Sequence, residues 1–202
     1  MKFRFIFTTS IISPEREQLY LERITKTIQQ LQHLPFVFYI LENNGIRETE
    51  LNSIQNVTLL YTNTNKIDAF SDRKGIKEFS DIMFLSEKYM FDDNDLIIKF
   101  TGLYTLNDTS FLDLVYSLES NYDAFIKWFN ICTNKYLYDD CILGLFALRY
   151  KYLKEFNYME MLSHPSMEHV FARYIRETVI SDRIKDITHL GMCYRGETSV
   201  VF

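Results

Sequence analysis

Apolar runs of strand length alternate with amphipathic segments of helix length through the first half of the chain. The run Phe36 to Leu41, for example, lies between Pro35 and the turn sequence Asn43-Asn44-Gly45. A continuous apolar run of this kind is typical of a strand that is buried on both faces. Because parallel strands need long crossover connections, the alternation predicts right-handed βαβ units and an α/β fold with a mixed, mostly parallel sheet flanked by helices. Strands are expected at Phe3 to Phe7, Phe36 to Leu41, Val57 to Tyr61 and Leu96 to Phe100.

Two long helices are predicted between these strands. The first begins after Ser13, a favourable N-cap, with Pro14 at the first helical position and acidic residues in the opening turn. The spacing of its apolar residues is that of an amphipathic helix, and they are Tyr20, Ile24, Ile28 and Leu31. The second helix is expected over Gly75 to Met90, and its inward residues are Ile76, Phe79, Met83 and Met90.

The regular alternation ends after Tyr104, and the second half of the chain has a less regular pattern. Nothing in the 202 residues reads as a linker, and a chain of this length buries one substantial core. We therefore expect one domain over residues 1–202, in which a regular half at 1–104 is followed by a less regular half at 105–202. The second half is expected to contain a short helix capped by Asp108 or Thr109, strands over Ala124 to Phe129 and Ile142 to Leu148, and helices near Tyr150 to Met161 and Ser166 to Val179.

Charge, cysteine usage and hydropathy argue against several classes of protein. A net charge of −5 disfavours a protein whose main partner is nucleic acid. Cys132, Cys141 and Cys193 form no Cys-x-x-Cys unit, so neither a disulfide framework nor a zinc cluster is indicated. The longest apolar run, Cys141 to Leu148, is too short for a transmembrane segment. A cytoplasmic protein is expected.

Polar and basic residues follow the fourth strand and open the Gly75 helix. In an open α/β sheet, ligands lie beyond the carboxyl ends of the strands, where helix N-termini also gather. Lys99, Thr101 and Gly102 stand at such an edge and offer a cation, a hydroxyl and close backbone approach. Arg73 and Lys74 are cations at a helix start, where the helix dipole disfavours them unless an anion balances their charge. These residues favour a phosphate-bearing substrate.

The segment Lys99-Phe100-Thr101-Gly102-Leu103-Tyr104, preceded by Asp72-Arg73-Lys74-Gly75, resembles a known family. It is similar to small viral and bacterial nucleotide-sugar glycosyltransferases of the GT-A type, whose members usually carry Lys-x-Thr-Gly-Arg-Tyr. Leu103 here replaces that arginine and removes the contact it could make to a diphosphate. The resemblance follows most of the chain in the order of its elements and implies a single-domain GT-A-like (Rossmann-like) fold, with a nucleotide-binding half at 1–104 and an acceptor half at 105–202.

The resemblance implies a glycosyltransferase of polysaccharide biosynthesis, which moves a sugar from a nucleoside-diphosphate sugar to a glycan or lipid-linked acceptor. Inversion is the expected outcome, with a carboxylate that deprotonates the acceptor hydroxyl and cations that stabilise the departing diphosphate. Glu168 resembles the acidic helix start that bears the base in inverting GT-A enzymes, and Asp139 and Asp140 are alternatives. The substrate-binding candidates are Thr8, Thr9, Glu42, Asn43, Asn44, Arg73, Lys74, Gly75, Lys99, Thr101, Gly102 and Tyr104.

No residue is assigned as a metal ligand. Asp93-Asn94-Asp95 has the Asp-x-Asp pattern that many nucleotide-sugar transferases use to hold a divalent cation. These residues precede the fourth strand, however, so they are expected at its amino end, far from the diphosphate. Lys99 could offset leaving-group charge without a metal, and a role for a divalent cation, Mn or Mg, stays open.

Two other functions stay open beside glycosyl transfer. A sugar nucleotidyltransferase usually has a glycine-rich, basic loop after its first strand, whereas Thr8 to Ser13 contain neither glycine nor lysine. A non-catalytic nucleotide-sugar-binding domain is favoured by Leu103 and by the lack of a metal motif after the fourth strand. The absence of Gly-x-Ser-x-Gly, P-loop and Gly-x-Gly-x-x-Gly sequences argues against serine hydrolases, P-loop proteins and dinucleotide-binding enzymes.

Overall fold

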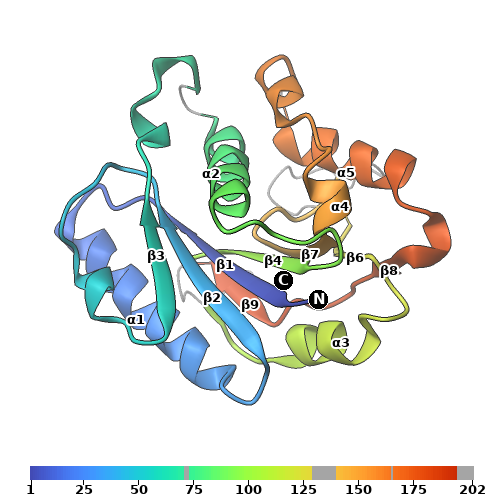
Figure 1. Cartoon of the computed structure of the whole chain (residues 1–202), viewed down its shortest axis with the longest axis horizontal. Coiled ribbons are helices and arrows are strands. Elements are labelled where there is room, and N and C mark those ends of the chain that lie inside the picture. Colours follow the sequence, from blue (N-terminus) through green and yellow to red (C-terminus); the bar gives the residue numbers. More distant parts are fainter. Residues whose placement is uncertain (71–72, 129–139, 165, 195–202) are drawn as a thin grey trace.

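A seven-stranded sheet forms the centre of the protein (Figure 1). The computed structural model describes residues 1–70, 73–128, 140–164 and 166–194. The strand order is β3-β2-β1-β4-β7-β6-β8, in which β7 runs antiparallel to both neighbours and the other adjacent pairs are parallel. The expected α/β fold with a mostly parallel sheet is therefore confirmed. The strands of this sheet are β1 (Phe3–Thr9), β2 (Phe36–Glu42), β3 (Val57–Tyr61), β4 (Leu96–Thr101), β6 (Ala124–Ile126), β7 (Leu145–Arg149) and β8 (Ile184–Asp186).

Helices cover both faces of the sheet (Figure 1). One face carries α1 (Pro14–Gln30) and α3 (Ser110–Leu118), together with a small sheet made of β5 (Tyr104–Leu106) and β9 (Met192–Tyr194). The opposite face carries α2 (Lys74–Lys88), α4 (Tyr150–Leu153) and α5 (Met167–Thr178). Short 3₁₀ turns complete the described chain, and they are η1 (Glu50–Ser53), η2 (Thr64–Lys66), η3 (Asp68–Phe70), η5 (Tyr158–Leu162) and η6 (Ser181–Arg183).

The alternation of side chains along β1 divides the core into two clusters. Phe5 and Phe7 pack with α1 residues such as Tyr20, whereas Ile6 packs with α2 residues such as Phe79. Successive residues of a strand point to opposite faces of the sheet, so a strand with a layer on each face must be apolar throughout. This requirement explains the unbroken apolar runs in the sequence.

The elements of the first half were predicted closely, with one error at the end of α2. Ser13 caps α1 as expected, and its hydroxyl accepts a hydrogen bond from the Arg16 amide at 3.3 Å. The α2 helix ends at Lys88, and Met90, predicted to point inward, is 86% exposed with a φ of 45°. The chain reverses at Met90, so the buried apolar residue here is Phe91.

The second half differs more from the prediction. The strand expected from Ile142 begins at Leu145, because Cys141 and Ile142 pair locally with Trp128 and Lys127. The helix expected over Tyr150 to Met161 is the short α4 followed by η5, while α5 matches its predicted range closely. Strands β5, β8 and β9, of three residues each, were not predicted. Across the described ranges, no helix combines the length and apolarity needed to cross a bilayer.

Candidate functional site

The carboxyl ends of β1, β2 and β4 meet at one edge of the sheet, as the sequence predicted. Register places Thr9 beside Glu42 and Thr8 beside Thr101. The strand alternation then divides these side chains between the two faces. Thr8 follows Ile6 on the α2 face, and Lys99 and Thr101 lie on the same face, whereas Thr9 and Glu42 follow Phe7 and Ile40 on the α1 face.

Lys99 is the centre of a polar cluster on the α2 face. Its side chain is 3% exposed, and its ammonium lies 2.8 Å from Glu78 Oε2 on α2. The same nitrogen donates to Thr101 Oγ1 at 2.5 Å and to the Leu143 carbonyl oxygen at 2.7 Å. Thr8 Oγ1 donates to the other Glu78 oxygen at 3.1 Å. A protonated lysine has three N–H donors, so all the donors of Lys99 are engaged.

Glu42 is the centre of a second cluster, on the α1 face. Its carboxylate is fully buried and accepts hydrogen bonds from Thr9 Oγ1 at 2.7 Å and from the Ile11 amide at 3.1 Å. Further donors are the Asn44 amide and Arg47 Nη2, each at 3.2 Å. These bonds engage the lone pairs of both oxygens. Glu42 therefore fixes the loops after β1 and β2, and a ribose hydroxyl would have to displace one of these donors.

The loop after β2 continues this cluster toward β3. Asn44 Nδ2 donates to the Ile11 carbonyl oxygen at 2.7 Å, and the Asn65 amide donates to the Asn43 carbonyl oxygen at 3.0 Å. Asn43 is 6% exposed, and its Oδ1 atom has no hydrogen-bond partner among the described residues. A buried amide oxygen without a donor is costly, so Asn43 is a position where a ligand donor would be stabilising.

The start of α2 faces α5 rather than Lys99. The Gly75 amide donates to Met167 Sδ at 3.2 Å, and a Cβ atom at Gly75 would lie 2.8 Å from that sulfur. Arg73 Nη1 donates to the His164 carbonyl oxygen at 3.1 Å, and Lys74 is exposed. The structure thus separates Arg73, Lys74 and Gly75 from the Lys99 cluster by about one helical turn, and it is Glu78 that α2 presents to Lys99. Asp72 lies outside the described residues.

The segment from Gly102 to Tyr104 closes the edge between α1 and the small sheet. A Cβ atom at Gly102 would lie 2.9 Å from the Tyr20 ring and 3.2 Å from Thr9 Cγ2, so only glycine fits here. Tyr104 opens β5, and its ring lies 6.4 Å from that of Phe100. Leu103, which stands where the resembling family has arginine, packs against the α1-face core. Gly102 therefore serves close packing at the strand end.

Asp81 belongs to the site and was not predicted from the sequence. It is 2% exposed and accepts hydrogen bonds from Thr62 Oγ1 at 2.6 Å and from Thr64 Oγ1 at 2.9 Å. Burial raises the pKa of Asp81 to about 6, against the hydrogen bonds from the threonines, which lower it. Lys77, on the preceding turn of α2, donates to Asn65 Oδ1 at 3.0 Å.

The missed residues share one signal in the sequence. Lys77, Glu78 and Asp81 follow Gly75 within two turns of a helix whose inner face is otherwise apolar except for Ser86. Residues three and four apart lie on one side of a helix, so Lys77 and Asp81 mark a polar sector at the beginning of the buried face. Polar residues on a buried helix face are expected to have partners, and this sector could have been identified by that rule.

Asp81 makes stability depend on pH. An ordinary aspartate titrates near pH 4, whereas the pKa of Asp81 is about 6 in the folded protein. The folded protein therefore keeps a proton that the unfolded chain releases, and the free energy of unfolding falls as pH rises through this window. We expect Asp81→Asn to remove this pH dependence. Relative to wild type, the free energy of unfolding of the variant should therefore rise by on the order of 2–3 kcal/mol between pH 4 and pH 7.

Urea unfolding at several pH values measures the effect of Asp81→Asn. The matched control is Asp92→Asn, which changes an exposed aspartate in the turn before β4. Parallel pH profiles for wild type and Asp81→Asn would contradict the raised pKa.

The proposed acceptor-half carboxylates gather around Cys141. Asp140 is fully buried and its Oδ1 accepts from the Cys141 amide at 2.9 Å, while Cys141 Sγ donates to the Glu168 carbonyl oxygen at 3.5 Å. Burial is the main cause that raises the pKa of the Cys141 thiol, and the Asp140 and Glu168 carboxylates raise it further. Glu168 Oε2 accepts from Ser166 Oγ at 3.2 Å. Asp139 lies outside the described residues.

The start of α5 connects the acidic pair, Asp140 and Glu168, with α2. Met167 precedes Glu168 and contacts Gly75, so the acidic pair lies on the α2 side of the sheet. Lys99 reaches the same region, because it bonds the carbonyl oxygen of Leu143, two residues after Cys141. The α2 face therefore carries both the Lys99 cluster and the carboxylates of Asp140 and Glu168.

The Asp-x-Asp pattern lies at the other end of β4. Asp95 immediately precedes β4 and its Oδ2 lies 2.8 Å from Arg4 Nη2, and Asp93 lies 2.6 Å from Lys154. Within the described ranges, no three His, Cys, Asp or Glu side chains come close enough together to hold a metal ion. Both aspartates are therefore paired with cations of the chain near the amino end of β4.

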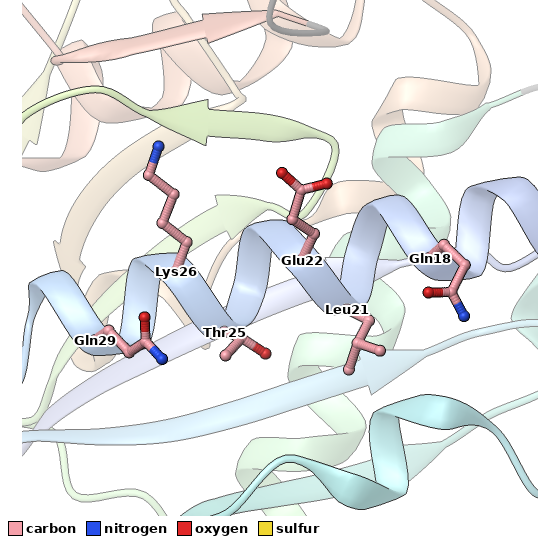
Figure 2. Close-up of a pocket in the computed structure, with 6 residues that line it drawn as sticks. All are labelled: Gln18, Leu21, Glu22, Thr25, Lys26 and Gln29. Carbon is pink, nitrogen blue, oxygen red and sulfur yellow. The ribbon is translucent and has the colours of Figure 1, made fainter.

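A surface depression of about 590 Å³ lies along α1. Figure 2 shows its six lining side chains on successive turns of this helix. Binding sites usually combine groups from several elements that converge on a concavity, and the lining of this depression comes from a single helix. The candidate site is therefore the sheet edge. The lining residues are Gln18, Leu21, Glu22, Thr25, Lys26 and Gln29.

The fold is similar to that of solved enzymes that handle nucleotide sugars and nucleotides. A proposed nucleotide-diphospho-sugar transferase from Desulfovibrio desulfuricans G20 aligns over 93% of this chain and 80% of its own, with 10% identity and a TM-score of 0.58. The inositol-1-phosphate CTP transferase from T. maritima aligns over 92% of this chain and 85% of its own, with 12% identity and a TM-score of 0.56. An active-site mutant of LgtC aligns over 91% of this chain and 72% of its own, with 8% identity and a TM-score of 0.53.

The likeness at such low identity shows the fold. The chain has the GT-A-like fold, with a mixed, mostly parallel sheet between helices. No family model and no curated protein matches the sequence. The same fold occurs in a sugar transferase and in a CTP transferase, so the fold alone does not define the reaction.

Proposed function

We propose that this protein is a glycosyltransferase, which moves a sugar from a nucleoside-diphosphate sugar to a glycan or lipid-linked acceptor in cytoplasmic polysaccharide biosynthesis. The observation that carries the proposal is the buried Lys99 cluster at the carboxyl ends of β1 and β4. A buried ion pair contributes little net stability. Charged groups that the fold does not require, at the edge where such sheets bind ligands, favour a binding role.

The donor lies across the sheet edge in this proposal. Lys99, Thr101 and Thr8 bind the diphosphate on the α2 face, and Gly102 lets the end of β4 pack closely against Tyr20 beside them. The nucleoside lies toward the loops after β1 and β2, where Thr9, Glu42, Asn43 and Asn44 are held. Tyr104 borders the edge from β5, and Arg73 and Lys74 add positive charge at the start of α2.

The transfer step is a single displacement that inverts the anomeric carbon. The bond between this carbon and the leaving phosphate oxygen breaks as a bond to the acceptor oxygen forms. Glu168 or Asp140 takes the acceptor proton, and Asp139 is the third candidate for this role. Lys99 stabilises the negative charge that develops on the diphosphate, because a positioned cation in a poorly solvated site is effective there.

Turnover of a panel of nucleotide sugars tests this function. We expect release of a nucleoside diphosphate from at least one donor, slowly with water and faster when oligosaccharide acceptors are added. Chromatography of the nucleotide products measures it, with and without Mn²⁺ or Mg²⁺. Binding of a donor without any release of diphosphate would instead indicate a non-catalytic nucleotide-sugar-binding domain.

A sugar nucleotidyltransferase is the second candidate. The observation that favours it is the likeness of the fold to the CTP transferase from T. maritima over 92% of this chain. In that reaction a sugar phosphate attacks a nucleoside triphosphate and pyrophosphate leaves. Incubation with each nucleoside triphosphate and a set of sugar 1-phosphates distinguishes the two reactions, because only this candidate releases pyrophosphate and forms a nucleotide sugar.

A further inference from the structure

Glu78 occupies the position at Lys99 that an anionic ligand would take. Its Oε2 atom lies 2.8 Å from the Lys99 ammonium, and its Oε1 atom accepts from Thr8 Oγ1 at 3.1 Å. One carboxylate therefore bridges the two side chains that β4 and β1 present at this edge. The arrangement, two oxygens shared between an ammonium and a hydroxyl, is one that a phosphate group can reproduce with two of its own oxygens.

Lys99 has no donor left for a phosphate while Glu78 is bound. Its other two hydrogen bonds go to Thr101 on the same strand and to the Leu143 carbonyl oxygen. The Leu143 acceptor is a backbone oxygen fixed by the fold, and the Thr101 acceptor is a neutral hydroxyl, so of the three acceptors Glu78 is the one that carries negative charge. A phosphate oxygen can reach the ammonium only by replacing one of the three acceptors.

Glu78 is the acceptor that can leave. Its side chain is 21% exposed, whereas that of Lys99 is 3% exposed. It stands on α2, and rotation of its side chain can carry the carboxylate to solvent without moving the helix. The neighbouring Asp81 carboxylate lies on the next turn of the same helix. Burial is the main cause that raises the pKa of Asp81, and the charge of Glu78 raises it further, so departure of Glu78 also relieves a repulsion within α2.

We propose that Glu78 is a resident counter-anion, which holds Lys99 and Thr8 in the ligand-free protein and yields both to the diphosphate of the donor. This inference rests on the proposed function and adds regulation to the same site. Because the carboxylate competes with the ligand for one cation, it lowers the affinity for every diphosphate. It also keeps the ammonium oriented before the ligand arrives and offers the leaving diphosphate a competitor that promotes release of product.

Substitution of Glu78 by glutamine tests the inference with inorganic pyrophosphate as the probe. Glu78→Gln keeps the side-chain length, and its amide oxygen can accept from Lys99 while its NH2 group donates to Thr8 Oγ1, but it removes the competing charge. We expect pyrophosphate to bind Glu78→Gln on the order of tenfold more tightly than wild type, measured by calorimetry at constant ionic strength. The matched control is Glu87→Gln, which changes an exposed glutamate near the far end of α2 and is expected to leave the affinity unchanged.

A second variant covers the case in which Glu78→Gln does not fold. Glu78→Asp keeps the charge but shortens the side chain, so it cannot bridge Lys99 and Thr8 as closely, and its affinity for pyrophosphate is expected to lie between those of wild type and Glu78→Gln. Equal or weaker binding by both variants, with clear binding by wild type, would overturn the inference and leave the proposed function standing. No binding of pyrophosphate or of any nucleoside diphosphate by wild type and variants would overturn both.

Discussion

Lys99→Met is expected to weaken pyrophosphate binding by about 100-fold or more. Methionine is unbranched, is one atom shorter than lysine and fits a buried, irregular space, so the change removes the charge and its three hydrogen bonds while keeping most of the packing. The lysine is almost fully buried, and a cation is more effective at binding an anion there than in water. Calorimetric titration with pyrophosphate and with nucleoside diphosphates measures the loss.

The single substitution leaves the Glu78 carboxylate without its cation, which by itself destabilises the protein. The double variant Lys99→Met with Glu78→Gln removes both charges and separates folding from binding. We expect it to melt near the wild-type temperature and still to bind pyrophosphate poorly. Glu78→Gln should tighten binding in the wild-type background and have no effect once Lys99 is absent, because the two residues act through the same contact.

Lys154→Met is the matched control for Lys99→Met. Lys154 also pairs with a carboxylate, Asp93 at 2.6 Å, but it does so near the amino end of β4. Its substitution is expected to leave pyrophosphate affinity within twofold of wild type. Equal affinities for wild type, Lys99→Met and Lys154→Met would remove Lys99 from the site and with it the main support for a diphosphate ligand.

The central sheet could be predicted because its strands must be apolar on both sides. Phe5 and Ile6 pack in different clusters, one on each face, and the whole run therefore stands out in the sequence. The same reasoning fails for β5, β8 and β9, which have three residues each. Strands that short carry too few side chains for a periodic pattern, and their pairing depends on contacts with segments distant in sequence.

The edge that carries the candidate site followed from topology alone. Parallel strands end on one side, so Thr8, Thr9, Glu42 and Thr101 had to lie near one another. Their division between two faces depends on register, since a shift of one residue would exchange them. The surroundings of Arg73 and Lys74, by contrast, did not follow from topology. Their charge at a helix start suggested an anion nearby, whereas the structure directs Arg73 to the His164 carbonyl oxygen.

The partners of the buried polar residues could not be read from the sequence, because they come from tertiary contacts. Glu78 meets Lys99 only because α2 packs across β4, and Arg47 reaches Glu42 only because the loop after β2 folds back. The result is that Lys99 and Glu42, the two charged residues predicted at the strand ends, are already paired with other parts of the chain. A ligand at this edge must therefore replace the protein partners of these residues. Its own groups must make the same kinds of contact as the protein groups that they replace.

The Asp93-Asn94-Asp95 segment has the sequence of a metal-binding motif, but in the structure both of its aspartates pair with basic residues. Asp95 is 1% exposed, and its carboxylate pairs with Arg4 at 2.8 Å and accepts from the Lys2 amide at 2.7 Å. The Arg4 guanidinium is itself buried and lies over the Phe91 ring at 4.4 Å. We expect Asp95→Ala to lower the free energy of unfolding by about 3–5 kcal/mol, because it leaves a buried arginine without its counter-charge.

Asp93→Ala is the control for Asp95→Ala within the same motif. Its side chain is largely exposed and pairs with Lys154 at the surface, where ion pairs contribute little. Urea unfolding is expected to show a large loss of stability for Asp95→Ala and an almost unchanged midpoint for Asp93→Ala, while pyrophosphate affinity stays at the wild-type value in both at temperatures where they are folded. Loss of pyrophosphate or metal-dependent nucleotide binding in a stably folded Asp93→Ala would contradict this assignment, because it would mean that the acidic segment acts on the ligand and that the binding edge extends to the amino end of β4.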